Sequence, residues 1–281
     1  MHRFSQVDVF SDEPHRGNPV AVVHAADDLD EGQMSSFARW TNLSETTFLL
    51  PPTQPGADYR VRIFTPTVEL PFAGHPTLGS AHAWLEAGGE PRAADELVQE
   101  CAAGLVRVRR GERLELAAPP LVRSGPVGKA EVTRIAAALR LEPGQLVDAA
   151  WVDNGPGWLG LLLDSAQTVL ALDPDWGALA GRDVGVLGPY PDREQGRVGA
   201  QVEVRAFCAG KGMSEDPVTG SLNAGLAQWL TADGRLPARY VAAQGTVLGR
   251  AGRVHVRREE DQVWVGGATR TVVRGEVDLS R

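Results

Sequence analysis

The sequence predicts an α+β protein of two pseudo-symmetric domains, each a curved mixed or antiparallel sheet, or a barrel, wrapped around a central helix. Three observations support this prediction. Landmarks recur once, at a nearly constant spacing, along the 281 residues. Each copy contains a strand-like run of alternating apolar residues. Each run is followed by a loop rich in Gly, Pro and Thr and by a helix with few charges. Because a helix that is apolar on nearly every face is normally buried, each half needs a sheet that encloses its helix.

The internal repeat is visible in three pairs of residues. Each pair lies in a similar local sequence, and its members are 143 to 145 positions apart. The pairs are Asp8 and Asp153, Arg62 and Arg205, and Trp84 and Trp229. A single long period of this kind indicates a duplicated structural unit. Two unrelated α/β units with similar loops are the alternative.

The elements follow in order from apolar periodicity and from Gly and Pro positions. We expect strands at about Glu45–Leu50, Tyr59–Phe64, Val202–Phe207, Val263–Val265 and Thr271–Val273, the last two pairing back with the first half. We expect central helices at about Pro76–Ala87 and Val218–Thr231, a lesser helix at Lys129–Arg140, and a linker at Pro119–Pro126. The first domain is predicted to span residues 1–120, rejoined by 268–281, and the second 127–267.

Composition excludes several classes of function. The formal net charge is −8 and no basic run occurs, so neither nucleic acid nor a membrane surface is expected as a partner. With only Cys101 and Cys208, a disulfide framework or a cysteine-rich zinc site is not expected. The stretch Gly210-Lys211-Gly212 does not fit a phosphate loop. The chain lacks a signal-peptide pattern and a long apolar segment, so a cytoplasmic location is expected.

Both central helices are expected to begin in unusual sequences, residues 72–77 and 215–221. The first N–H groups of a helix lack intrahelical partners and carry a partial positive charge, and small residues there let an anion approach the backbone. If a pseudo-twofold axis relates the halves, the space between the two starts suits a small carboxylate. Ordinary capping by Thr77, Asp216 and Ser221 is the alternative.

Four segments, taken together, resemble the PhzF (phenazine biosynthesis-like) family within the diaminopimelate-epimerase-like fold. They occur in the expected order and span nearly the whole chain. They are Val7–Phe10 with Gly17–Pro19, Asn42–Phe48, Ala73–Thr77 and Glu215–Ser221, and Val263–Gly267 also fits.

The resemblance implies a homodimer that isomerises a small carboxylic acid by acid/base chemistry, without a metal or a cofactor. It gives Glu45 the proton-transfer role and makes His75 and Asp216 candidates to polarise or protonate the substrate. It also implies a set of substrate-binding residues: Asn18 at the edge of the cleft, the backbone N–H groups of Gly74 and Gly220, and Ser221. Related epimerases use two cysteines, one at each helix start. This chain has Ala73 and Thr219 at about those places, which disfavours a two-thiol racemase.

The chemistry requires a carboxyl group that is able to remove a proton and return it. Such a group needs a pKa well above about 4.3, and burial among apolar groups raises the pKa of a carboxyl. Glu45 has apolar sequence neighbours, and no Lys or Arg occurs from position 41 to 57. In a strand Glu45 shares a face with Thr47 and Leu49. A glutamate that ends a strand or faces water is the alternative.

The repeat predicts that Glu45 is unmatched in the second half. The positions 143 to 145 residues later hold Gly188, Pro189 and Tyr190, and none of these is a carboxylate. This favours a duplicated scaffold with one proton-handling side. Two other functions stay open: a lyase that uses the same base, and a non-catalytic protein that binds small acids.

Overall fold

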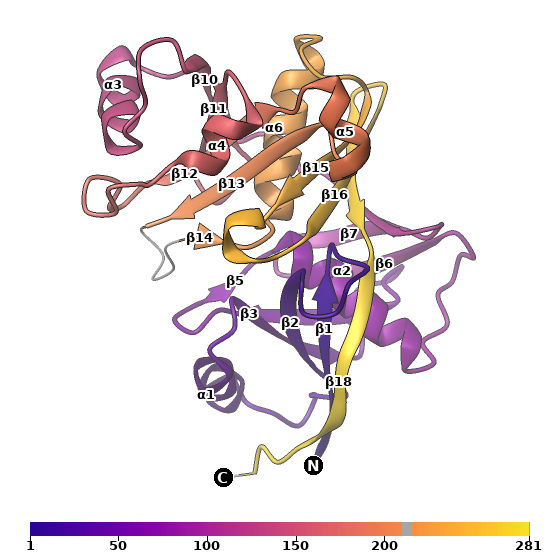
Figure 1. The fold of residues 1–281 in the computed structure, drawn as a ribbon. Helices are drawn as coiled ribbons and strands as arrows, with labels where there is room; N and C mark the ends of the chain where they lie inside the picture. Colours follow the sequence, from indigo (N-terminus) through magenta and orange to yellow (C-terminus); the bar gives the residue numbers. More distant parts are fainter. Residues whose placement is uncertain (210–214, 281) are drawn as a thin grey trace. The chain divides into compact units, whose positions relative to one another are not determined.

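The computed structural model describes residues 1–209 and 215–280, so the stretch at residues 210–212 lies outside the described residues. The chain folds as two compact units (Figure 1). Unit 1 contains Met1–Ala117 and Gly266–Arg281, and unit 2 contains Ala118–Val265.

Unit 1 is a mixed sheet with one helix on each of its two faces. Its elements are β1 (His2–Val9), β2 (Asn18–Val23), α1 (Glu31–Thr41), β3 (Glu45–Leu50), β4 (Tyr59–Phe64), β5 (Glu69–Leu70), α2 (Gly74–Glu86), β6 (Glu96–Cys101), β7 (Gly104–Arg109), β8 (Leu114–Ala117) and β18 (Thr269–Val277). Phe37 of α1 packs on Phe48 of β3. On the other side of β3, Ser80 of α2 donates a hydrogen bond to Thr47. The side chains of β3 therefore alternate between the two helices.

Unit 2 repeats this plan. Its elements are β9 (Arg123–Pro126), α3 (Lys129–Ala138), β10 (Leu146–Asp153), β11 (Trp158–Leu163), α4 (Ala166–Ala171), β12 (Asp183–Pro189), α5 (Asp192–Val198), β13 (Val202–Cys208), β14 (Glu215–Asp216), α6 (Gly220–Ala232), β15 (Arg239–Gln244), η1 (Thr246–Leu248), β16 (Gly252–Glu259) and β17 (Gln262–Gly267). The central helix α6 contacts β10, β11 and β16.

The strand pairings confirm the duplication. In unit 1, β1–β2 is antiparallel, β2–β3 parallel, β3–β4 and β4–β5 antiparallel, β4–β6 parallel and β6–β7 antiparallel. In unit 2, β10–β11, β11–β12, β12–β13, β13–β14, β13–β15 and β15–β16 follow the same series of directions. A series of six matching pairings is not expected from two unrelated units.

Side chains repeat as well as strands. Arg62 donates from Nε and Nη2 to the two carboxylate oxygens of Glu69 at 2.7 and 2.6 Å. Arg205 binds Glu215 in the same two-pronged way, at 2.9 and 2.8 Å. Each guanidinium also lies over the Phe two residues later in its strand. The arginine of the sequence repeat therefore ties together the same pair of strands in each unit.

Both central helices are buried, as their composition predicts. The helix α2 begins at Gly74, two residues before the predicted start at Pro76. The helix α6 begins at Gly220, two residues after the predicted start at Val218. The last strand, β18, contains the predicted strand Thr271–Val273 and pairs with β1 of unit 1, as the sequence predicts. No helix in the described part of the chain is long and apolar enough to cross a membrane.

The predicted linker at Pro119–Pro126 is wrong in its second part. Residues Arg123–Pro126 form β9, which pairs antiparallel with β10. All four residues of β9 are exposed, so the strand shows no apolar alternation. It is held by backbone pairing and by Arg123, whose guanidinium lies over the ring of Trp151 in β10. A sequence pattern based on burial cannot detect such a strand.

Candidate active site

Glu45 is the first residue of β3, and its side chain is 14% exposed. Strand alternation places it on the α2 side, together with Thr47. The predicted strand boundary and the predicted face are both confirmed. Glu45 does end a strand, as one alternative expects, but its side chain is not fully exposed to water.

His75 lies in the first turn of α2, and its Nε2 is 3.3 Å from Oε2 of Glu45. Its Nδ1 is 3.3 Å from Nδ2 of Asn18, at the start of β2. Burial lowers the pKa of His75 to about 3, against a smaller opposite effect of a hydrogen bond with the Pro19 backbone. His75 is therefore a neutral imidazole near pH 7, with one donor and one acceptor nitrogen.

Two strands, β2 and β3, and the helix α2 thus bring Asn18, Glu45 and His75 together in unit 1. Gly74, the first residue of α2, is buried and directly precedes His75 in the sequence. The helix start has no side-chain cap: Thr77 donates its hydroxyl to the carbonyl of Ala73 and accepts a hydrogen bond from Gln99. Capping by Thr77, the alternative reading of this start, is therefore wrong.

In unit 2, the predicted residues gather at the start of α6. Gly220 is the first residue of the helix, and Asp216 ends β14 just before it. Asp216 Oδ2 accepts a hydrogen bond of 2.5 Å from Thr219 Oγ1. Ser221 Oγ accepts one of 3.0 Å from the indole N–H of Trp158. Here too the helix has no side-chain cap hydrogen bond, so Asp216 and Ser221 do not cap it.

The predicted asymmetry of Glu45 is wrong. Glu45 and Asp183 each lie one residue before the residue that pairs with Phe64 or Phe207, which are equivalent strand positions. Asp183 is therefore the counterpart of Glu45. The first hairpin is shorter in unit 2: Gln6 pairs with Ala21 in unit 1, whereas the equivalent Trp151 pairs with Leu159 in unit 2. A fixed offset of 143 to 145 misses this position because the spacing changes within the repeat.

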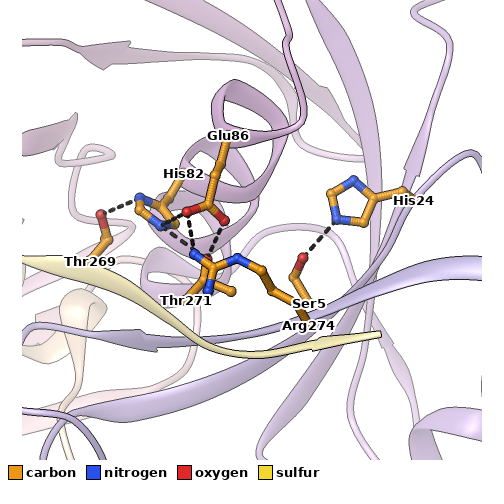
Figure 2. Close-up of polar contacts among 7 residues, drawn as sticks. All are labelled: Ser5, His24, His82, Glu86, Thr269, Thr271 and Arg274. Carbon is orange, nitrogen blue, oxygen red and sulfur yellow. Dashed lines mark hydrogen bonds and ion pairs between the residues drawn. The ribbon is translucent and has the colours of Figure 1, made fainter. Parts of the chain in front are cut away.

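A second polar cluster lies at the other end of α2 and was not predicted as a site (Figure 2). His82 contacts Thr269 and Thr271 of β18 at 3.0 and 3.1 Å. Glu86 accepts hydrogen bonds from Thr271 and Arg274. Figure 2 shows these groups pointing toward one another between the helix and the strand. They fasten β18 to the central helix, so His82 has a structural role.

Both cysteines are free and buried. Burial raises the pKa of the Cys101 thiol. Neither cysteine lies at a helix start: Cys101 ends β6 and Cys208 ends β13. The positions before Gly74 and Gly220 hold Ala73 and Thr219, as the sequence indicates.

The chain is similar to known proteins over nearly its whole length. The profile of the PhzC-PhzF family, described as phenazine biosynthesis-like protein, matches residues 7–275. A trans-2,3-dihydro-3-hydroxyanthranilate isomerase of Pseudomonas aeruginosa is 36% identical over 92% of this chain and 91% of its own. A Schizosaccharomyces pombe protein named antisense-enhancing sequence 1 is 35% identical over 98% of both chains. The crystal structure of a PhzF-family protein of Enterococcus faecalis superposes with a TM-score of 0.80 at 27% identity, covering 99% of both chains.

The duplicated α+β fold and these relatives define an isomerase, which confirms the enzyme class expected from the sequence. The chain belongs to the PhzF family.

Proposed function

We propose that this isomerase moves a proton within one small carboxylic acid, with Glu45 as the group that removes and returns it. The observation that carries the proposal is the contact of Glu45 with a buried, neutral His75 at the start of the apolar central helix. General acid–base groups are effective where neighbouring groups fix their position and restrict water.

In the proposed reaction the Glu45 carboxylate takes a proton from one carbon atom of the substrate, and the resulting carboxylic acid delivers it to another. Because burial keeps His75 uncharged, it does not hold Glu45 ionised as a cationic partner would. A neutral imidazole either donates to the carboxylate of Glu45 or accepts from its protonated form. Because the amide Nδ2 of Asn18 can only donate, Nδ1 of His75 is the accepting nitrogen, so Nε2 carries the ring proton and faces the Glu45 carboxylate. Asn18 contacts the other ring nitrogen and fixes the plane of the ring.

The proposed substrate class is a small acid with an amino group or an unsaturated ring. Two relatives suggest it, since one of Pseudomonas aeruginosa and one of Pseudomonas fluorescens are named trans-2,3-dihydro-3-hydroxyanthranilate isomerase. The uncapped helix starts at Gly74 and Gly220 suit its carboxylate, because backbone N–H groups in the first turn of a helix attract anions.

The proposal includes three expectations from the sequence. The reaction takes place without a metal or a cofactor in a cleft between the two halves, the chain works as a homodimer, and it works in the cytoplasm. Light scattering of the purified protein tests the homodimer: we expect the mass of two chains, and the mass of a single chain would contradict it. A crystal structure with a bound small carboxylate tests the cleft.

The variant Glu45→Gln tests the central residue, because glutamine keeps the shape of the side chain and cannot carry the proton. With trans-2,3-dihydro-3-hydroxyanthranilate as the first probe, we expect kcat to fall by roughly 100- to 10,000-fold. The affinity for 3-hydroxyanthranilate, measured by calorimetry, should change by no more than about threefold. A variant with the kcat of the wild type would remove Glu45 from the mechanism.

The mass of the product separates the proposal from the two other functions. An isomer has the mass of the substrate, and an elimination product is lighter. A small acid that binds and is recovered unchanged from both the wild type and Glu45→Gln indicates a binding protein.

A further inference from the structure

We propose that Thr219 and Gln244 are positioning residues that fix the orientation of the Asp216 carboxylate in unit 2. This inference rests on the proposed function, in which Asp216 belongs to the substrate site. Thr219 and Gln244 come from the start of α6 and the end of β15, 25 positions apart, and both side chains are buried.

Thr219 is the direct link to the carboxylate. Its hydroxyl donates to Asp216 Oδ2 at 2.5 Å and accepts a hydrogen bond from Gln244 Nε2 at 2.9 Å. A hydroxyl has one proton to donate, and because Gln244 supplies a proton to its oxygen, the proton of Thr219 is directed to Asp216. The chain of bonds thus has a fixed direction, from the amide through the hydroxyl to the carboxylate.

Gln244 is fully used by this arrangement. Its Oε1 accepts from the backbone N–H of Thr219 at 3.0 Å and from Nδ2 of Asn223 at 2.8 Å. Its Nε2 donates to the backbone carbonyl of Asp216 at 3.1 Å as well as to the Thr219 hydroxyl. One buried side chain therefore holds the backbone on both sides of the loop from β14 to α6, with no alternative partner to exchange with.

The loop is also closely packed. Gly245 follows Gln244 with φ of +87°, and a Cβ placed there would lie 2.6 Å from the carbonyl oxygen of Pro217. A side chain at this position would displace the loop that carries Asp216, so glycine is required by contact as well as by backbone angle.

The described residues of unit 1 form no equivalent network at the start of α2, and this difference indicates the role of the network in unit 2. The strand register puts Leu70 where unit 2 has Asp216. The residue before the helix is Ala73 where unit 2 has Thr219. The helix is held instead by Gln99, which donates to the Thr77 hydroxyl one turn further along. A helix start without a side-chain cap can therefore fold without such a network. The Thr219–Gln244 pair occurs in the unit in which the carboxylate of Asp216 has to be oriented.

A matched pair of variants at Thr219 tests the inference in the full chain. Thr219→Val keeps the shape and removes the hydroxyl, whereas Thr219→Ser keeps the hydroxyl. On trans-2,3-dihydro-3-hydroxyanthranilate we expect kcat/KM to fall by about 10- to 100-fold in Thr219→Val and by less than about threefold in Thr219→Ser. Tyr190→Phe is the control, because it removes another buried hydroxyl bond of unit 2, to Glu203, away from α6.

Crystal structures of the two variants give a readout that does not depend on turnover. The Asp216 carboxylate should rotate in Thr219→Val and keep its orientation in Thr219→Ser. An unrotated carboxylate in Thr219→Val, or equal kcat/KM for the two variants, would overturn the inference. Full activity of Asp216→Asn is a different result: it would show that the proposed function is wrong about Asp216, whatever Thr219 does.

Discussion

The duplicated arginine–glutamate pairs allow one prediction with its control inside the same chain. In unit 2 the side chains of Arg205 and Glu215 are only 4% and 6% exposed, whereas in unit 1 those of Arg62 and Glu69 are 26% and 31% exposed. The two-pronged bonding is the same in both pairs, which differ in burial and in a second carboxylate, that of Glu31, beside Arg62. Replacing the glutamate by glutamine removes the two-pronged charge partner of the guanidinium in each unit.

The expected losses of stability differ strongly. Removing one partner of a buried ion pair costs about 3 to 5 kcal/mol, because the remaining charge stays desolvated. Arg205 retains hydrogen bonds from Nη1 to two backbone carbonyls, so we expect a loss near the lower end, about 3 kcal/mol, for Glu215→Gln. Arg62 retains a second carboxylate, that of Glu31, and is partly hydrated. For Glu69→Gln we therefore expect about 1 kcal/mol or less.

Urea unfolding of both variants measures this difference, and hydrogen exchange in β4 and β13 assigns it to the correct unit. With a slope of roughly 2 kcal/mol per M, Glu215→Gln should lower the midpoint by about 1.5 M and Glu69→Gln by about 0.5 M or less. Equal shifts, or a larger shift for Glu69→Gln, would refute the argument that burial decides the contribution of these pairs.

Two further predictions concern pH. Burial holds the pKa of His75 near 3, below its ordinary value of 6.5, so the unfolded chain takes up a proton that the folded chain does not. Stability should fall as the pH drops from about 6.5 toward 3, by up to about 4 kcal/mol, and His75→Gln should flatten this slope in urea titrations at several pH values. An unchanged slope would contradict the buried neutral imidazole. Burial raises the pKa of Glu203, although Tyr190 and Thr246 hydrogen bonds lower it in part. The ionised carboxylate is therefore costly above the unfolded pKa of about 4.5, and Glu203→Gln should raise the melting temperature at pH 8 more than at pH 5. If Glu203→Gln melted at a lower temperature than the wild type at pH 8, the ionised Glu203 carboxylate would be stabilising, contrary to this prediction.

Much of the fold could be predicted from the sequence because its signals are local. The strand at Tyr59–Phe64 alternates clearly, and its ends and those of the strand at Glu45–Leu50 match the structure. The central helices are recognisable because almost all their side chains are apolar or small. The position of β9 could not be predicted, since its residues are exposed and the strand carries no apolar pattern.

The candidate site was predictable in its residues and less so in its contacts. The sequence singled out Asn18, Glu45 and His75, and the structure adds that they touch. Asp183 was missed because loop lengths differ between the repeats, and only strand register shows its relation to Glu45. The partners of Asp216 were missed for another reason. Gln244 reaches it across a long sequence separation, and no local pattern marks such a contact.

Exchange of the substrate proton with solvent is the most direct test of Glu45 as the acid/base group. Trans-2,3-dihydro-3-hydroxyanthranilate is incubated in D₂O with each protein, and deuterium in the recovered substrate and in the product is followed by mass spectrometry. Because the Glu45 side chain is 14% exposed, the proton that it holds can exchange with D₂O before it is returned. The account therefore predicts deuterium in the presence of the wild type and none above the enzyme-free background with Glu45→Gln. Deuterium entering at the wild-type rate with Glu45→Gln would mean that a different group removes the proton.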